Sequence, residues 1–187
     1  MIFTPMRAFP LLAAVLAFAP CAAAQAGLIQ NVPGRQTLDL AGPWRAIVDP
    51  IGSVDSGIGA NKKSKSPGEL IPYDFDTAAQ LMVPGDWNTQ RPELLFYEGA
   101  VWYEKDFDYT PKPGRRQFVW FGAANYHAAV FFNGRKLGEH VGGFTPFQFE
   151  VTGLLRDTGN FLIVMADNLR PGFQPPTVSR VFIVAGL

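Results

Sequence analysis

Short runs of alternating apolar and polar residues, separated by turn residues, fill most of the chain. The clearest run is 100–109, where one side carries Val101, Tyr103, Lys105 and Phe107 and the other carries Trp102, Glu104 and Asp106. Further strands are predicted at 37–49, where Gly42-Pro43 divides two runs, and at 80–83, 116–121, 147–151 and 161–166. Because alternation with a period of two is that of a β-strand, the sequence predicts about eight strands and no long helix.

The segment AAVFFNGRKLG carries the strongest turn signal. Asn133-Gly134 joins two strand runs by two residues, both of which tolerate the positive φ of a type I′ turn. The run 116–121 is continuously apolar over its last four residues, 118–121, which is typical of a strand in the middle of a sheet with both faces buried. Together these patterns predict an all-β chain: a two-sheet antiparallel β-sandwich of jelly-roll, galactose-binding-like type.

Residues 51–69 lack a sustained apolar period and are rich in glycine, proline and serine. We interpret this segment as an exposed loop. Its three lysines, Lys62, Lys63 and Lys65, could attract an anionic ligand, but a solvated loop tip is the favoured interpretation.

The first 26 residues have the three-part plan of a secretory signal peptide. Arg7 precedes an apolar stretch that is too short to span a bilayer, and small residues follow it. Cleavage is expected after Ala26, with Ala24 as the alternative, and the rigid Pro20 argues against lipid attachment at Cys21. We therefore expect an exported, periplasmic or extracellular protein that has no cysteine and no membrane association after cleavage.

Charge and length bound the remaining possibilities. Lysine plus arginine number 16, as do aspartate plus glutamate, so no basic field exists for a nucleic-acid partner. A chain of 187 residues with 48% apolar content builds one ordinary core, so residues 27–187 are expected to form one domain.

The chain offers little for metal or cofactor chemistry, and we expect neither. His127 and His140 are its two histidines, and their spacing matches no zinc pattern. The phosphate-binding and nucleophile-elbow motifs are absent.

Glycoside hydrolysis needs two facing carboxylates, but solvated or hydrogen-bonded roles are favoured for the four glutamates in strand or turn settings. These are Glu98, Glu104, Glu139 and Glu150.

Tryptophan gives a candidate sugar contact, because a flat indole can stack on the apolar face of a pyranose. Trp44, Trp102 and Trp120 are expected in the core. Trp87 lies in the turn-rich PGDWNTQRPE and is expected to be partly exposed, which makes it the candidate sugar contact, although a structural role is favoured for it as well.

Three segments together resemble the N-terminal sugar-binding domain of glycoside hydrolase family 2, the family of β-galactosidases, β-glucuronidases and β-mannosidases. They are LDLAGPWRAIVDP (38–50), VPGDWN through YEGAVWYEKDF (83–107), and FFNGRKLGEHVGGFTPFQFEVTGLL followed by GNFLIVMADN (131–168). The E-H-x-G-G-x-T-P-F form is most similar to the β-glucuronidase-like branch. The resemblance covers about 38–168, most of the mature chain.

The resemblance implies a domain of an exported β-glycosidase that acts on carbohydrate. In that family the catalytic glutamates belong to a TIM barrel that follows an immunoglobulin-like domain, and neither fits in 187 residues, so no catalytic residue is assigned here. Pro176-Thr177 match the start of the family's sugar-contacting loop, but 178–187 depart from it, which suggests a truncated or frame-shifted reading. Asp167 and Asn168 match the end of the last strand and are candidates for the sugar-binding rim, although a turn-forming role is favoured for them.

Two other functions stay open on the sequence. The chain could act as a free-standing carbohydrate-binding module that uses exposed aromatic residues. It could also be a structural or interaction domain whose motif residues only shape the sandwich.

Overall fold

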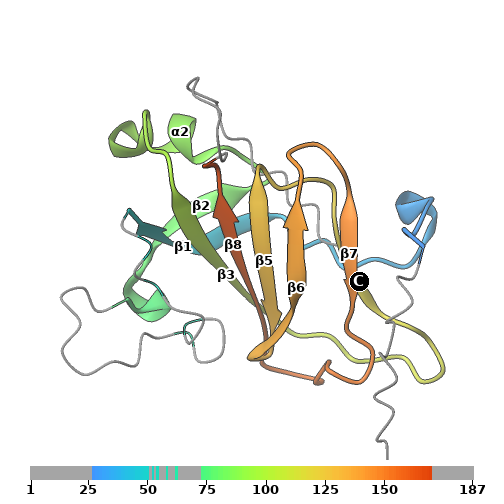
Figure 1. Cartoon of the computed structure of the whole chain (residues 1–187). Helices are drawn as coiled ribbons and strands as arrows, with labels where there is room; N and C mark the ends of the chain where they lie inside the picture. Colours follow the sequence, from blue (N-terminus) through green and yellow to red (C-terminus); the bar gives the residue numbers. More distant parts are fainter. Residues whose placement is uncertain are drawn as a thin grey trace, which may run out of the picture.

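The structure is a computed structural model that describes residues 27–50, 52, 54, 58, 62 and 73–169. The predicted signal peptide and the segment 178–187 lie outside these residues. Within them the chain is all-β and forms two antiparallel sheets (Figure 1), as the sequence predicts. The strands are β1 (Gly42–Asp49), β2 (Ala79–Val83), β3 (Ala100–Phe107), β4 (Phe118–Phe121), β5 (His127–Phe132), β6 (Arg135–Val141), β7 (Phe147–Glu150) and β8 (Asn160–Asp167). Short helical turns are η1 (Val32–Gly34), η2 (Phe75–Thr77), α2 (Trp87–Gln90) and η3 (Pro92–Leu94).

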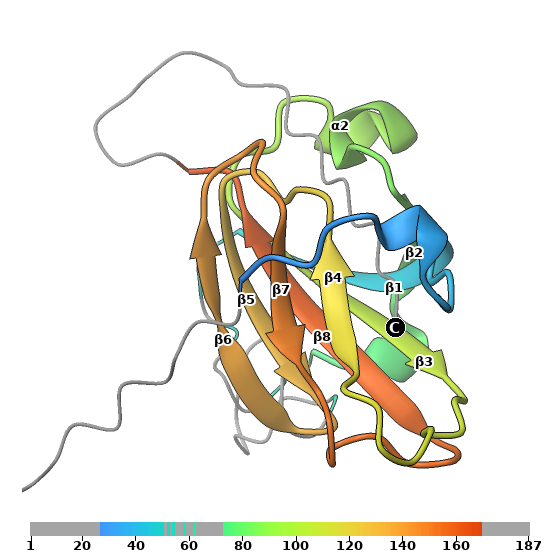
Figure 2. The ribbon, with the colours of Figure 1, turned by 90° about the vertical axis from the view of Figure 1, so that its right-hand side faces the viewer.

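The larger sheet has the order β2-β1-β3-β8-β5-β6, and β4 pairs with β7 in the smaller one. Figure 2 shows the smaller sheet lying across one face of the larger. The main hydrophobic core fills the space between them, with Trp44 and Tyr103 from the larger sheet and Phe121 from the smaller one fully buried. Burial of each such side chain contributes about 1.5–3 kcal/mol or more, so this core is the main source of stability.

The opposite face of the larger sheet is also covered. Trp102 and Ile163 pack there with Val54, Ile58 and other apolar residues of a second buried cluster. The interpretation of 51–69 as an exposed loop is therefore wrong at Val54 and Ile58. The sequence shows no sustained apolar period around these two residues, so the pattern alone does not reveal that they are buried.

The strand predicted at 116–121 forms as β4, but its predicted place in the middle of a sheet is wrong. β4 forms the smaller sheet with β7 alone, and only Val119 and Phe121 are buried. Phe118 on the other face is half-buried, with the Arg116 guanidinium 5.0 Å from its ring centre. The continuous apolar run thus reflects an outer face that is partly covered by neighbouring chain, not a central strand.

The β5–β6 hairpin is confirmed. Asn133 and Gly134 have φ of 47° and 85°, in the left-handed region that the type I′ turn requires. The Asn133 side chain also donates to the Leu154 carbonyl (2.8 Å) and to Asn160 Oδ1 (3.0 Å), and it accepts from the Phe161 amide (2.9 Å). One turn residue therefore ties the hairpin to the start of β8.

Asn133→Ala is expected to lower the free energy of unfolding by about 3 kcal/mol, because three hydrogen bonds are lost and alanine is strained at positive φ. Asn133→Gly removes the same bonds but not the backbone freedom, so we expect a loss about 1 kcal/mol smaller. Urea unfolding followed by circular dichroism measures both. Equal losses in the two variants would contradict the contribution of the left-handed backbone.

Candidate functional site

Three side chains converge on one backbone carbonyl at the end of the sandwich where β3 begins and β8 ends. The Tyr97 oxygen accepts hydrogen bonds from Trp87 Nε1 (3.3 Å), Asn88 Nδ2 (3.4 Å) and Asn168 Nδ2 (3.4 Å). Asn168 Oδ1 accepts from the Gly99 amide at 2.7 Å. Trp87 and Asn168, which the sequence proposed as sugar contacts, are thus brought together, but around the chain segment that enters β3.

The expectation that Trp87 is partly exposed is wrong, since its side chain is 0% exposed. Asp86 caps the one-turn helix α2 by accepting from the Thr89 amide at 2.9 Å. The indole then packs in the main core, with its ring centre 6.2 Å from that of Tyr97. In this arrangement the ring presents no face to a sugar, and its role is to support the end of the sandwich.

Asp167 and Asn168 end β8 in different environments. Asp167 is half-buried, and its Oδ1 accepts from the Leu169 amide at 2.8 Å, which is a bond of the kind that the favoured turn-forming role expects. Asn168 is buried in the network around Tyr97. A sugar-contacting role for either residue stays a prediction.

Asn88 and Tyr97 belong to the same network and were missed from the sequence. Tyr97 donates its hydroxyl to the Ala100 carbonyl at 2.8 Å. Burial, together with the negative charges of Asp49 and Asp167, raises the pKa of Tyr97 well above its usual range, so the phenol stays a donor at neutral pH. In the sequence, the signal for Tyr97 is a glycine two residues later. Gly99 has a φ of 139°, a backbone conformation that requires glycine.

Exposed apolar side chains crowd the same end of the sandwich. Asp167 pairs in register with both Ala100 and His127, and His127 pairs with Val141, so β3, β8, β5 and β6 have their neighbouring ends here. Large apolar side chains are exposed in the segments just beyond these ends. They are Leu95, Phe96, Val141, Phe144 and Leu169. An end with this much exposed apolar surface is suited to contact another protein domain.

A cluster of charges surrounds the buried carboxylate of Glu104 on the outer face of β1 and β3. Arg45 binds Glu104 through two nitrogens, at 2.6 and 2.9 Å, and Lys62 lies 2.8 Å from the same carboxylate. Both cations also pair with Asp106. The solvated interpretation of Lys62 is therefore wrong, while Lys63 and Lys65 lie outside the described residues.

Burial raises the pKa of Glu104, and neighbouring Asp106 adds to the rise although Lys62 opposes it. Burial also opposes ionisation of Asp106, but the hydrogen bonds with Lys62 and Glu104 and the charges of Lys62 and Arg45 together outweigh it and lower the pKa of that carboxyl. These two carboxylates are engaged by cations from β1 and from Lys62. They serve to hold the fold together, and their oxygens are not free to act on a glycosidic bond.

The two histidines bond to neighbours on the sheet. His127 Nε2 lies 3.0 Å from Glu139 Oε2, and His140 Nε2 lies 3.0 Å from Thr145 Oγ1. Across residues 27–50 and 73–169 with the four isolated positions, no three His, Cys, Asp or Glu side chains gather as metal ligands would. The same part of the chain contains no helix long and apolar enough to cross a membrane.

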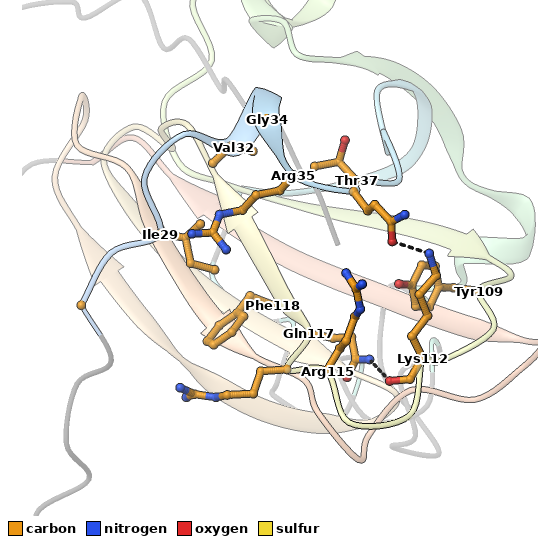
Figure 3. Close-up of a pocket in the computed structure, with 13 residues that line it drawn as sticks. Ile29, Val32, Gly34, Arg35, Thr37, Tyr109, Lys112, Arg115, Gln117 and Phe118 are labelled. Atoms are coloured by element: carbon orange, nitrogen blue, oxygen red, sulfur yellow. Dashed lines mark hydrogen bonds between the residues drawn. The ribbon is translucent and has the colours of Figure 1, made fainter.

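A pocket of about 840 Å³ lies between residues 27–37 and the β3–β4 connection (Figure 3). Arg35 lies on one side of it, and Arg115 rises from the other side towards the N-terminal segment. Lys112 and Arg116 complete a set of four cations, and no acidic residue is among those that line the pocket. The pocket was not anticipated, because its walls are far apart in the sequence and neither is part of a motif.

At the edge of this pocket Arg116 forms a bidentate pair with Glu150, at 3.0 and 2.6 Å. The hydrogen bonds from Arg116 and then from Thr152 lower the pKa of Glu150 to about 2. A depressed carboxylate pKa contributes stability that is complete above the ordinary value of 4.5 and is lost as the pH falls towards 2. We expect the Glu150 side-chain carbon to titrate near pH 2 by NMR and to return towards pH 4.5 in Arg116→Met. A midpoint that is unchanged in Arg116→Met would contradict this assignment.

The comparisons with known proteins agree with the fold. No family model matches the chain. The β-glucuronidase of Paenibacillus borealis is 35% identical over 122 residues, which are 63% of this chain and 18% of that protein. The β-glucuronidase of Rattus norvegicus is 34% identical over 104 residues, 50% of this chain and 16% of that protein. The structure of Bifidobacterium dentium β-glucuronidase complexed with coumarin-3-O-glucuronide superposes with a TM-score of 0.58 at 31% identity, covering 71% of this chain and 20% of that one.

Fold and comparisons together define the class: an all-β sandwich domain of the kind found in larger glycosidases. The chain spans only about a fifth of the length of the relatives it matches. Its resemblance to glycoside hydrolase family 2, and to the β-glucuronidase-like members in particular, is confirmed.

Proposed function

We propose that this chain is the N-terminal sugar-binding sandwich of an exported family 2 β-glycosidase. The observation that carries the proposal is the partial match to β-glucuronidases, which covers 63% of this chain but 18% of the relative. The complete enzyme would hydrolyse terminal β-linked sugars with retention through a covalent glycosyl-enzyme, using carboxylates outside this sandwich. The sandwich itself would support the reaction without performing it.

The ion pairs of the sandwich favour a role in which it supports catalysis without performing it. Glu104 and Asp106 are held by Arg45 and Lys62, Glu139 by Lys136, and Glu150 by Arg116. The exposed apolar end that carries Phe96 and Phe144 gives a surface through which the sandwich would contact the immunoglobulin-like and barrel domains of the complete enzyme.

A chimera tests this proposal. The matched region of the Paenibacillus borealis enzyme is replaced by the corresponding residues of this chain, and hydrolysis of an aryl β-glucuronide is measured. We expect activity within about tenfold of the parent enzyme, and none in a matched variant from which the region is deleted. A folded chimera that is no more active than the deletion variant would overturn the proposal.

Export by the first 26 residues is part of the same proposal. Its support is the basic, apolar and small-residue plan of that segment. Expression with a bacterial secretion system, followed by N-terminal sequencing of the released protein, is expected to give Gly27 as the first residue. Retention of the uncleaved chain in the cell would contradict it.

A further inference from the structure

We propose that the pocket between residues 27–37 and the β3–β4 connection binds an acidic oligosaccharide, one that carries carboxylate or sulfate groups. It lies beside the smaller sheet, and its walls are the blue N-terminal segment and the loop below β4 in Figure 2.

The first argument for an acidic ligand is the positive charge around the pocket. Of the four lining cations, only Arg116 has a carboxylate partner among the residues that the structure describes. Lys112 Nζ lies 2.5 Å from Gln36 Oε1, and Arg35 Nε donates to the Gln30 carbonyl at 3.2 Å, so both are positioned by neutral oxygens that leave their charge intact. Arg115 forms no ion pair within the described part of the chain. Three cations around one pocket thus have no carboxylate partner among the described residues, which favours an anion that offers several acidic groups.

Shape and polarity carry the second step. A volume of about 840 Å³ falls in the range of small-molecule sites and is large enough for several sugar units. The side chains of Gln36, Thr37 and Gln117 offer amides and a hydroxyl for sugar hydroxyls, and the Tyr109 ring offers an apolar surface. Alternating polar groups and flat apolar surface suit a saccharide better than a compact inorganic anion.

Hydrogen bonds within the chain hold both walls of the pocket in place. Gln148 on β7 accepts from the Ile29 amide at 2.8 Å and donates to the Gly27 carbonyl at 3.2 Å. On the other wall, the buried Gln117 donates its side-chain amide to the Lys112 carbonyl at 3.2 Å. A site whose walls are already ordered loses less entropy on binding.

The choice of a saccharide over a nucleic acid rests on the proposed function and on the overall charge. Acidic and basic residues balance across the whole chain, and such a balance does not favour a nucleic-acid backbone as the partner. On a glycosidase, such a pocket would hold an acidic saccharide chain on the enzyme.

Isothermal titration of the purified protein with a heparin-derived tetrasaccharide tests the proposal. We expect saturable binding that weakens with added salt, and at least a tenfold loss in Lys112→Gln/Arg115→Gln, which removes two of the three cations of one wall and leaves the pair of Arg116 with Glu150 in place. The matched control is Arg135→Gln/Lys136→Gln, which removes one arginine and one lysine from exposed positions on β6 and is expected to bind like the wild type. Circular dichroism establishes that both variants are folded.

Equal binding by the two double variants would overturn the proposal, as would equal binding of neutral cellotetraose. Saturation by inorganic phosphate alone at the same affinity, or tighter binding of a 12-nucleotide DNA strand, would reassign the pocket to another ligand class and overturn it as well. The proposed function has a different readout, which is hydrolysis of a small aryl β-glucuronide by the chimera. The pocket variants are expected to leave that hydrolysis unchanged, so one proposal can fail without the other.

Discussion

Trp87→Ala is expected to lower the free energy of unfolding by about 4 kcal/mol. The indole is fully buried in the main core and donates to the Tyr97 carbonyl, so its removal leaves a large cavity and an acceptor with one donor fewer. Urea unfolding followed by circular dichroism gives the value. A loss of this size is a large part of the stability of an ordinary domain.

Two further variants separate packing from surface effects. Trp87→Phe keeps most of the buried volume and is expected to cost less than Trp87→Ala. Phe96→Ala removes an aromatic ring that is 89% exposed at the same end of the sandwich, and its stability is expected to stay within about 0.5 kcal/mol of the wild type. If Trp87→Ala lost less than about 1 kcal/mol, the ring would not be part of the core, and a sugar-stacking role for it would regain support.

Arg45→Met is expected to lower the free energy of unfolding by about 3 kcal/mol at neutral pH. The Glu104 side chain is 0% exposed, so removal of its bidentate partner leaves a buried carboxylate held by Lys62 alone. As the pH falls through the raised pKa of Glu104, the carboxyl takes up a proton and the cost of the unpaired charge disappears. The difference in the free energy of unfolding between Arg45→Met and the wild type should therefore be smaller in acid.

Arg116→Met is the matched control, because it removes an arginine that holds Glu150 with the same bidentate geometry at the protein surface. Both partners of that pair are solvated, so we expect a much smaller loss of stability at neutral pH. Urea unfolding of both variants at pH 7 and pH 4 makes the comparison. Equal losses in the two variants at pH 7 would contradict the distinction between the buried and the exposed pair.

Local patterns predicted the strands well and their surroundings poorly. The alternation around Trp102 and Tyr103 correctly assigns opposite faces, because side-chain direction in a strand depends on the backbone alone. The same pattern could not show that Lys62, 42 residues before Glu104 in the chain, completes an ion cluster with it. β4 was misplaced because an apolar run cannot tell a central strand from a strand whose outer face is covered by a distant segment.

The sequence named the candidate residues separately and did not predict which of them would meet. Trp87 and Asn168 do meet at the Tyr97 carbonyl, which the family motifs bring together, yet turn-rich sequence around Trp87 suggested exposure. The capping bond from Asp86 turns the ring inward, and a cap alone does not reveal which way the next side chain points. The basic pocket depends on long-range packing of the segment 27–37, so composition, which balances to zero net charge, concealed it.

Hydrolysis of an aryl β-glucuronide by the purified protein tests the central claim most directly. If the sandwich supports catalysis without performing it, the folded protein is expected to release the aryl group no faster than buffer alone. Turnover that follows the folded protein through purification and disappears when it is unfolded in urea would contradict the claim.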